Sequence, residues 1–296
     1  MKTSTKIKNR QDRVFYFFCY TIVTILTLLV LYPIVYIVSA SFSDSDMVVQ
    51  GKVWLWPVNF SLKAYEIILK RPQIWTGYKN TIIYTVSGTL INVAITLLCA
   101  YPMARKNLRG RGAIMFIFSF TMMFSGGMIP TYILVRNLGI MNTRWSVILP
   151  GAMSVYNMIV CRTFIENNIP DEMLEAAQID GCSNTQFFFR MVLPLSKAII
   201  AVLTLWYGVS HWNSYFNAFL YLREQDLYPL QIFLKEILIQ SEQLGGEEMI
   251  DVDNMSTIYV TLKYCVIVVS SVPLFCVYPF VQKHFQKGVM VGSVKG

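Results

Sequence analysis

The sequence predicts an all-α, polytopic membrane protein with six transmembrane helices. Its composition is the first reason: 55% of the 296 residues are hydrophobic and 14% are charged, whereas soluble domains carry roughly 25% charged residues. Run length is the second, because about 20 consecutive apolar residues cross the hydrocarbon core and six stretches reach that length. In lipid, each such stretch must satisfy its own backbone polar groups, so the six stretches are predicted to be helices.

The apolar runs cover residues 14–39, 81–103, 113–135, 146–164, 198–222 and 258–281. The first run follows a basic segment, as in a signal peptide, but it exceeds the 7–15 residues of a signal-peptide hydrophobic region, and no small-residue cleavage site follows it. We therefore expect a retained first span. No linker or low-complexity segment interrupts the chain, so residues 1–296 are predicted to form a single transmembrane domain.

The distribution of basic residues predicts the orientation. If the N-terminus lies inside, 15 of the 25 Lys and Arg residues fall in inner segments and nine in outer ones. Inner loops carry this excess in membrane proteins. We expect both termini, the loop 165–197 and the C-terminal tail 282–296 to be cytoplasmic. The net charge of +8 is accordingly interpreted as attraction to the anionic leaflet and not to nucleic acid.

Polar side chains inside spans are candidates for function. The candidate substrate pathway comprises Asn92, Asn157, Trp212, Asn213, Tyr215 and Asn217. Amides and aromatic faces suit sugars, which offer apolar C–H patches ringed by hydroxyls. The alternative is that these amides join packed helices, each for about 0.6–2 kcal/mol. Lys263, near the outer end of the last span, either meets an acidic sugar or extends to the membrane surface.

Motifs for chemistry on this chain are missing from the sequence. The six runs contain no Asp or Glu and one His, and no G-x-S-x-G elbow occurs. There is no P-loop for a nucleotide, and the six cysteines stand singly without a C-x-x-C pair. We expect no enzyme activity, metal or cofactor on this chain. An ion-coupled secondary transporter or channel for a small polar solute is one open interpretation of such a chain, although proton coupling usually places acids within spans.

The polar loop between the fourth and fifth runs carries the most informative pattern. It contains an EAA triplet, followed after three residues by Gly and after fifteen residues by Leu-Pro. The candidate coupling residues of this loop are Glu175, Ala176, Ala177, Asp180, Gly181, Leu193 and Pro194.

The first half of this loop is predicted to be a helix over residues 170–181. Pro170 suits a first turn, and the following Asp171 and Glu172 complement the helix dipole. At about 100° per residue, one side gathers Met173, Leu174, Ala176, Ala177 and Gly181, and the other gathers Glu172, Glu175 and Gln178. Gly181 is expected to turn the chain in a left-handed conformation. The alternative is an ordinary amphipathic helix on the membrane surface.

The spacing of this loop resembles the EAA loop of ABC importer permeases. Further matching segments are residues 126–130 with Leu138 and Gly139, the pair Trp212-Asn213, and residues 278–280 leading to Gly288 and to 292–296. The chain is similar to carbohydrate permeases of the maltose G-subunit type, within the type I importers. It resembles still more closely the LplC/YtcP-type branch of oligosaccharide permeases. Met191 departs from the Ile that is usual there, a swap that conserves volume and apolarity.

This resemblance implies the type I ABC importer permease fold and a role in taking up an oligosaccharide across a bacterial plasma membrane. It implies four kinds of partner: a second homologous permease, two ATPase subunits, an extracellular solute-binding protein, and lipid. ATP and Mg would bind the ATPase, and the EAA loop would dock on it. The C-terminal tail would also reach the ATPase, through Gly292, Lys295 and Gly296.

Overall fold

The computed structural model describes residues 10–246 and 255–292. Over these residues the chain forms helices joined by turns, without a β-strand, so the predicted all-α class is confirmed. Three helices are long and apolar enough to cross a membrane, and the number rises to six if each of three bent helix pairs counts as one span. The described residues divide into two parts, one of 10–70, 236–246 and 255–269, the other of 71–235 and 270–292.

The first part contains the helix of the first predicted span. This helix, α1 (Arg10–Ser41), is followed by the short helices α2 (Ser45–Val49) and α3 (Lys63–Leu69). The apolar side chains of α1 are exposed along most of its length, as expected for a helix whose solvent is lipid. Near its end, Ala40 and Val48 form a small core with Val260 and Tyr264 of α15 (Met255–Gly292).

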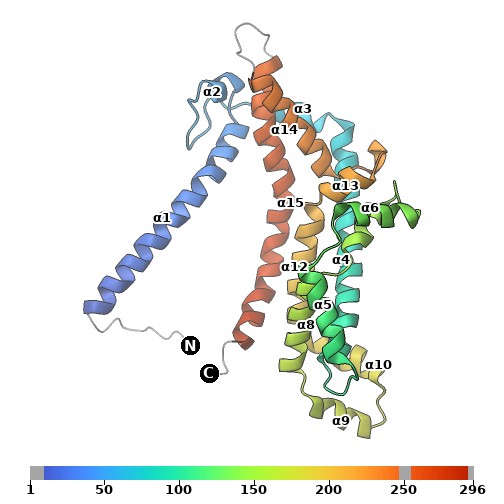
Figure 1. The fold of residues 1–296 in the computed structure, drawn as a ribbon. Helices are drawn as coiled ribbons and strands as arrows, with labels where there is room; N and C mark the ends of the chain where they lie inside the picture. The colour runs from blue at the N-terminus through green and yellow to red at the C-terminus, as the bar shows by residue number, and fades with distance from the viewer. Residues whose placement is uncertain (1–9, 247–254, 293–296) are drawn as a thin grey trace. The chain divides into compact units, whose positions relative to one another are not determined.

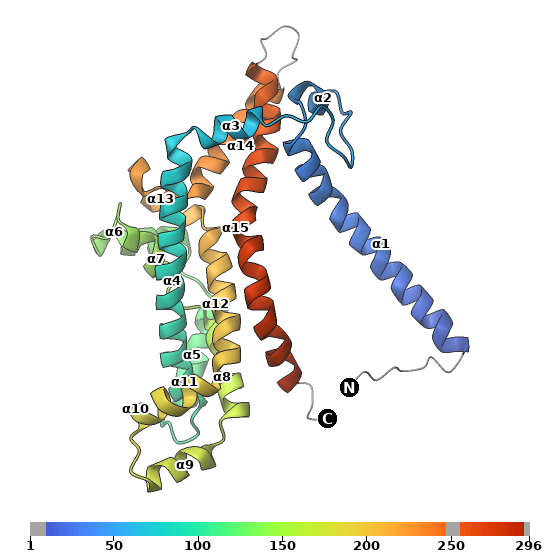
Figure 2. The same cartoon turned by 180° about the vertical axis from the view of Figure 1, so that it is seen from behind.

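The second part is built around one long helix, α4 (Pro72–Ala104), which packs against α8 (Val155–Asn168) and α12 (Lys197–Trp212) (Figures 1 and 2). Its core collects buried apolar residues from all three helices, including Leu97, Ala100, Met158, Ile165 and Leu203. The predicted span over 81–103 lies wholly within α4, and the helix begins nine residues earlier because Pro72 opens its first turn.

Two of the predicted spans, the third and the fourth, are bent within their runs. The run 113–135 divides into α5 (Arg111–Met123) and α6 (Met128–Asn137), which are turned by 112°, and Figure 1 shows α6 lying across the direction of α5. Gly127 has φ +86° between them, a conformation that glycine adopts without steric cost. The third predicted span is therefore a bent pair of helices, which their length and composition allow to count as one broken span.

The fourth run is interrupted by Pro150 and Gly151. Helix α7 (Arg144–Ile148) continues as the 3₁₀ turn η1 (Leu149–Gly151), and α8 leaves at 53° to this pair. Ser154 then begins α8, since its side chain accepts the backbone N–H of Asn157 at 3.4 Å. Proline cannot donate the helical hydrogen bond, which explains the interruption of the predicted run 146–164.

The last two predicted spans differ from the helices at their C-terminal ends. Helix α12 ends at Trp212, where Asn213 caps it and donates from Nδ2 to the carbonyl of Val209 at 3.0 Å, so the run 198–222 is not one helix. Its remainder forms α13 (Phe216–Tyr221), followed by η3 (Gln225–Leu227) and α14 (Leu230–Gly246). Helix α15 continues beyond residue 281 to Gly292, so the described part of the predicted tail is helical.

Candidate functional site

The EAA triplet lies on a separate short helix at one end of the second part (Figure 1). This helix, α9 (Asp171–Ile179), has Pro170 at its N-cap and two acids in its first turn, as the sequence predicted. Asp180 caps its end, and Gly181 takes φ +78°. The N–H of Cys182 then bonds to the carbonyl of Ala177 at 2.9 Å, which closes the left-handed turn that Gly181 was expected to make.

The two faces of α9 differ from the predicted arrangement at Ala176. Leu174 is buried, and Met173 and Ala177 pack beside it against the core of the second part. Ala176 is exposed, because it lies about 200° around the helix from Leu174. The exposed residues of α9 are Glu172, Glu175, Ala176, Gln178 and Ile179. We call Glu172, Glu175, Ala176 and Ile179 the outward face. The small-residue side was thus partly misassigned, and Ala176 belongs with the acids.

Ile179 is the residue of this face that sequence reasoning missed. Its side chain is 87% exposed, although isoleucine is among the residues most often buried. An isolated aliphatic residue between Gln178 and Asp180 in a polar loop was the available signal. An apolar side chain exposed on this face is available for contact with a partner surface.

The second arm of the loop returns to the membrane spans. Ser183 begins α10 (Asn184–Phe187) with a capping box, in which Ser183 and Gln186 bond to each other's backbone N–H. The chain continues as the π-helical turn η2 (Phe188–Val192) and as α11 (Leu193–Leu195), and then bends by 78° into α12. Leu193 is half-buried and Pro194 is exposed. We call residues 170–195 the coupling elbow.

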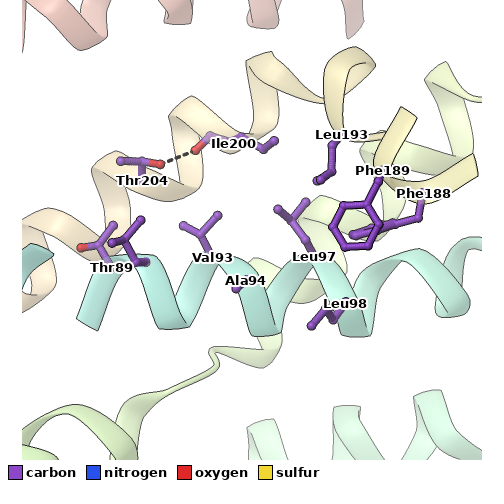
Figure 3. Close-up of a pocket in the computed structure, with 11 residues that line it drawn as sticks. Thr89, Val93, Ala94, Leu97, Leu98, Phe188, Phe189, Leu193, Ile200 and Thr204 are labelled. Carbon is purple, nitrogen blue, oxygen red and sulfur yellow. Dashed lines mark hydrogen bonds between the residues drawn. The ribbon is translucent and has the colours of Figure 1, made fainter. Parts of the chain in front are cut away.

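This second arm lines an apolar groove between α4 and α12, shown in Figure 3. The groove has a volume of about 440 Å³, and its end is formed by Phe188, Phe189 and Leu193. Thr204, one of its two polar lining residues, donates its hydroxyl to the carbonyl of Ile200 at 2.8 Å. The groove is therefore chemically unsuited to a sugar. Its lining shows that Phe188, Phe189 and Leu193 of the elbow lie beside α4 and α12.

Ion pairs join the helices next to the elbow. Glu166 on α8 accepts hydrogen bonds from Arg111 on α5 and from Arg162, the latter at 3.0 Å. Arg162 also donates from Nε to the carbonyl of Met103 in the last turn of α4 at 2.9 Å. These half-buried charges thus link three helices at the end of the second part that carries α9.

Two of the predicted pathway residues lie in the interior. Asn92 is buried and donates from Nδ2 to the carbonyl of Gly151 at 3.1 Å, which satisfies a backbone group freed at the break in the fourth run. Asn157 is buried in the first turn of α8. For Asn92 the contact matches the alternative interpretation, in which amides join packed helices.

The other pathway residues gather where α12 gives way to α13. Trp212 is buried and donates its indole N–H to the carbonyl of Ser270 at 3.0 Å, while Asn213 is exposed and Tyr215 and Asn217 are half-buried. Gln231 on α14 donates from Nε2 to the carbonyl of Trp212 at 3.3 Å.

Helix α14 adds a cation to this group. Lys235 is exposed, and its ammonium nitrogen lies 5.9 Å from the ring centroid of Tyr215. Gln231 and Lys235 are four residues apart and share one helix face. The arrangement combines an amide, an aromatic ring and a positive charge. Neither α14 residue was among the predicted sites, because the sequence placed them in an outer loop.

The predicted contacts of the C-terminal tail are described in part. Gly292 is the last residue of α15, and the structure describes its backbone only. Lys295 and Gly296 lie outside the described residues.

Comparison with known proteins identifies relatives along nearly the whole chain. A family model described as the binding-protein-dependent transport system inner membrane component matches residues 92–222. The polygalacturonan/rhamnogalacturonan transport system permease protein YtcP of Bacillus subtilis is 39% identical over 286 residues, covering 97% of this chain and all of YtcP. Protein LplC of the same organism is also 39% identical, over 89% of each chain.

A solved structure agrees with these relatives. A chain from the crystal structure of a bacterial ABC transporter involved in the import of the acidic polysaccharide alginate matches with a TM-score of 0.83 and 34% identity, covering 95% of this chain and 100% of that one. Proteins of this kind are multi-pass membrane components that rely on an ATPase carried by a separate subunit. The chain therefore belongs to the family of permease subunits of binding-protein-dependent ABC importers, among those that transport sugars.

Proposed function

We propose that the coupling elbow of this permease docks on a separate ATPase through the outward face of α9. The observation that carries the proposal is the exposed Ile179, flanked by the carboxylates of Glu172 and Glu175 on a helix whose other side is anchored in the core. The assembly contains a second permease, two ATPase subunits and an extracellular binding protein, and ATP and Mg bind the ATPase.

The test is recovery of the ATPase with this chain. The permease is tagged, expressed with its partner subunits, extracted in mild detergent and pulled down. We expect the wild type to bring down an ATPase and a second permease, and Glu175→Lys to lose the ATPase while keeping the second permease. Lys197→Glu, at an exposed position beyond the elbow, is the matched charge-reversal control. A wild type that purifies without an ATPase contradicts the proposal.

The orientation belongs to the same proposal. Docking of α9 on a cytoplasmic ATPase requires the loop 165–197 and both termini to face the cytoplasm, in agreement with the excess of Lys and Arg in these segments. Single cysteines introduced at exposed Gln178 and Trp56, in a background without native cysteines, test this in intact cells. A membrane-impermeant thiol reagent is expected to label position 56 and not position 178, and the reverse labelling contradicts the orientation.

We further propose that the solute is an acidic oligosaccharide containing uronate units. YtcP is named for polygalacturonan and rhamnogalacturonan transport, and the similar solved structure concerns alginate import. In this chain, the ammonium nitrogen of Lys235 lies 5.9 Å from the ring centroid of Tyr215. An ammonium group attracts a carboxylate. Lys263, whose ammonium nitrogen lies 5.0 Å from the ring centroid of Tyr264, is the second basic candidate.

Uptake measurements distinguish the two classes of sugar. Reconstituted importer is offered oligogalacturonides or neutral malto-oligosaccharides of equal length. We expect uptake of the acidic series alone, and Lys235→Gln to weaken it several-fold by removing the charge. Lys70→Gln is the control, since Lys70 is an exposed lysine already paired with Glu66 at 3.9 Å. Uptake of neutral sugars with no acidic uptake refutes the acidic proposal and leaves the importer proposal intact.

A further inference from the structure

The coupling elbow is tied to α4 by a buried arginine. Arg105 directly follows α4 and is 6% exposed. Its Nη1 lies 3.3 Å from Oδ1 of Asp171, the first residue of α9. Arginine is always charged in proteins, and a buried charge requires compensation. The ion pair therefore holds the start of α9 at the end of α4.

The same guanidinium also contacts the other arm of the elbow. Its Cζ atom lies 4.9 Å from the ring centroid of Tyr101 on α4 and 5.3 Å from that of Phe187 in α10. Tyr101 packs in turn on Phe188 of η2, with ring centroids 5.2 Å apart. The two distances from Cζ of Arg105 are within the range of cation–π contacts. Arg105 thus joins α4 to both arms of the coupling elbow at once.

Part of the hydrogen-bonding capacity of Arg105 is unused. Its Nε and Nη2 atoms are buried and have no hydrogen-bond partner within the part of the chain that the structure describes. Buried donors without a partner are costly, and such exceptions in a folded protein ask for an explanation. Because these N–H groups are unpaired among the described residues, the guanidinium of Arg105 can form new hydrogen bonds to α9 if α9 moves.

The neighbouring residue offers a natural contrast. Lys106 also approaches Asp171, with Nζ 3.5 Å from Oδ2, but its side chain is 85% exposed whereas that of Arg105 is 7% exposed. Exposed ion pairs are worth little because solvent screens them and the side chains must be ordered. Two cations therefore meet one acid, and the buried one supplies the firm connection.

We propose that Arg105 is the positioning residue that transmits displacement of α9 to α4, and through α4 to the membrane spans. This inference rests on the proposed docking of α9 on the ATPase. Arg105 contacts the inner side of the elbow and leaves the outward face untouched. Without Arg105, the ATPase still binds α9, but movement of α9 no longer reaches α4 efficiently.

The experiment separates binding from coupling. The complete importer, with its second permease, ATPase and binding protein, is reconstituted in liposomes with wild type, Arg105→Met, Asp171→Asn, the double variant or Lys106→Met. Two quantities are measured for each: recovery of the ATPase in a pull-down, and solute taken up per ATP hydrolysed. A residue that only stabilises the fold would lower the amount of complex without changing uptake per ATP in the complexes that form.

We expect Arg105→Met to lower uptake per ATP by about tenfold, within the range of coupling between sites, with ATPase recovery kept. Asp171→Asn should act in the same direction, the double variant should be no worse than Arg105→Met because one link is removed, and Lys106→Met should match the wild type. Wild-type uptake per ATP in Arg105→Met, or loss of ATPase recovery as severe as in Glu175→Lys, overturns the proposal.

Two further outcomes also decide the proposal. If Arg105→Met does not accumulate in the membrane, Asp171→Asn decides, since the Asp171 side chain is 31% exposed and its change to an amide is mild. Unchanged uptake per ATP in that variant then overturns the proposal. If the wild type itself recovers no ATPase, the proposed docking fails, and the role of Arg105 in coupling fails with it.

Discussion

At the scale of single residues, the most telling feature is the placement of one aliphatic side chain in water. Ile179 is 87% exposed on a helix whose Leu174 is 6% exposed. The two residues differ little in hydrophobicity, so their contrasting positions come from the rotation of α9 about its axis. The anchored side fixes which side chains point outward.

Replacing Ile179 by Ser is expected to weaken binding of the ATPase by about tenfold or more. In the proposed complex the ATPase covers this side chain, and truncating an anchor buried at an interface costs over about 1 kcal/mol. Titration of the purified permease complex with ATPase measures the change. Gln178→Ser, at the exposed neighbouring position, controls for the loop itself. Equal affinity of the two variants would remove Ile179 from the docking surface.

The surroundings of Gly77 leave no room for the methyl group of an alanine, so Gly77→Ala is expected to destabilise the protein. A Cβ atom there would lie 2.9 Å from the Cα of Leu230 and 3.0 Å from Cδ2 of Phe233. Since the nearer atom is backbone, α4 has to shift, and overpacking of this kind costs about 1–3 kcal/mol. Gly77→Ala should therefore lower the thermal unfolding midpoint in detergent. Gly112→Ala, with nothing within 4 Å, should not, and identical midpoints would refute this packing argument.

At the scale of elements, the second arm of the coupling elbow depends on both local hydrogen bonds and core packing. Its α10 has four residues and is closed at its start by the reciprocal bonds of Ser183 and Gln186. A helix this short is not stable by propensity alone. The cap and the burial of Phe187 and Phe188 therefore set its position.

Ser183→Ala should loosen this arm by about 0.5–2 kcal/mol, the usual cost of losing an N-cap. Hydrogen exchange of the amides of Asn184–Phe187 measures the effect and should rise several-fold, while exchange within α12 stays unchanged. Thr163→Ala is a matched control, because its hydroxyl bonds within α8, to the carbonyl of Ile159 at 2.9 Å. Unchanged exchange in Ser183→Ala would mean that aromatic packing alone holds the arm.

The elements also show which features the sequence could predict. Length and apolarity predicted where the spans lie, and the pattern of Pro170, Glu175 and Gly181 predicted α9 and its left-handed end. The helix breakers at Gly127 and Gly151 are visible in the sequence and indicate kinks, but the size of each bend, 112° and 53°, could not be predicted from them. Membrane helices tolerate such residues in either a kink or a full turn, and only tertiary contacts, such as Asn92 with the Gly151 carbonyl, select between the two.

Long-range polar contacts were equally beyond prediction. Asn80 donates from Nδ2 to the carbonyl of Asp226 at 2.7 Å, and Tyr84 donates its hydroxyl to that of Leu227 at 2.7 Å. These residues are more than 140 positions apart. A sequence without an alignment of relatives gives no register between such segments, so the pairing of α4 with η3 had to come from the structure.

At the scale of the whole molecule, charge predicts how the assembly responds to salt. The outward face carries Glu172 and Glu175, and Asp180 beside it is also exposed, so the proposed ATPase surface is expected to be basic. Raising salt from 0.1 to 1 M shortens the Debye length from about 10 to 3 Å. ATPase recovery should therefore fall with salt, while recovery of the second permease, joined through apolar spans, should hold. Recovery of both subunits that is independent of salt would contradict a charged docking surface.

The outward face of α9 has a consequence for a cell that makes several importers. Recognition through one short helix, with one exposed isoleucine and two carboxylates on its outward face, places few requirements on the rest of a permease. Different permeases that display the same face would bind the same ATPase subunits. We expect the uptake of one solute then to depend on how strongly the other permeases are expressed, a competition for energising subunits with no competition for solute.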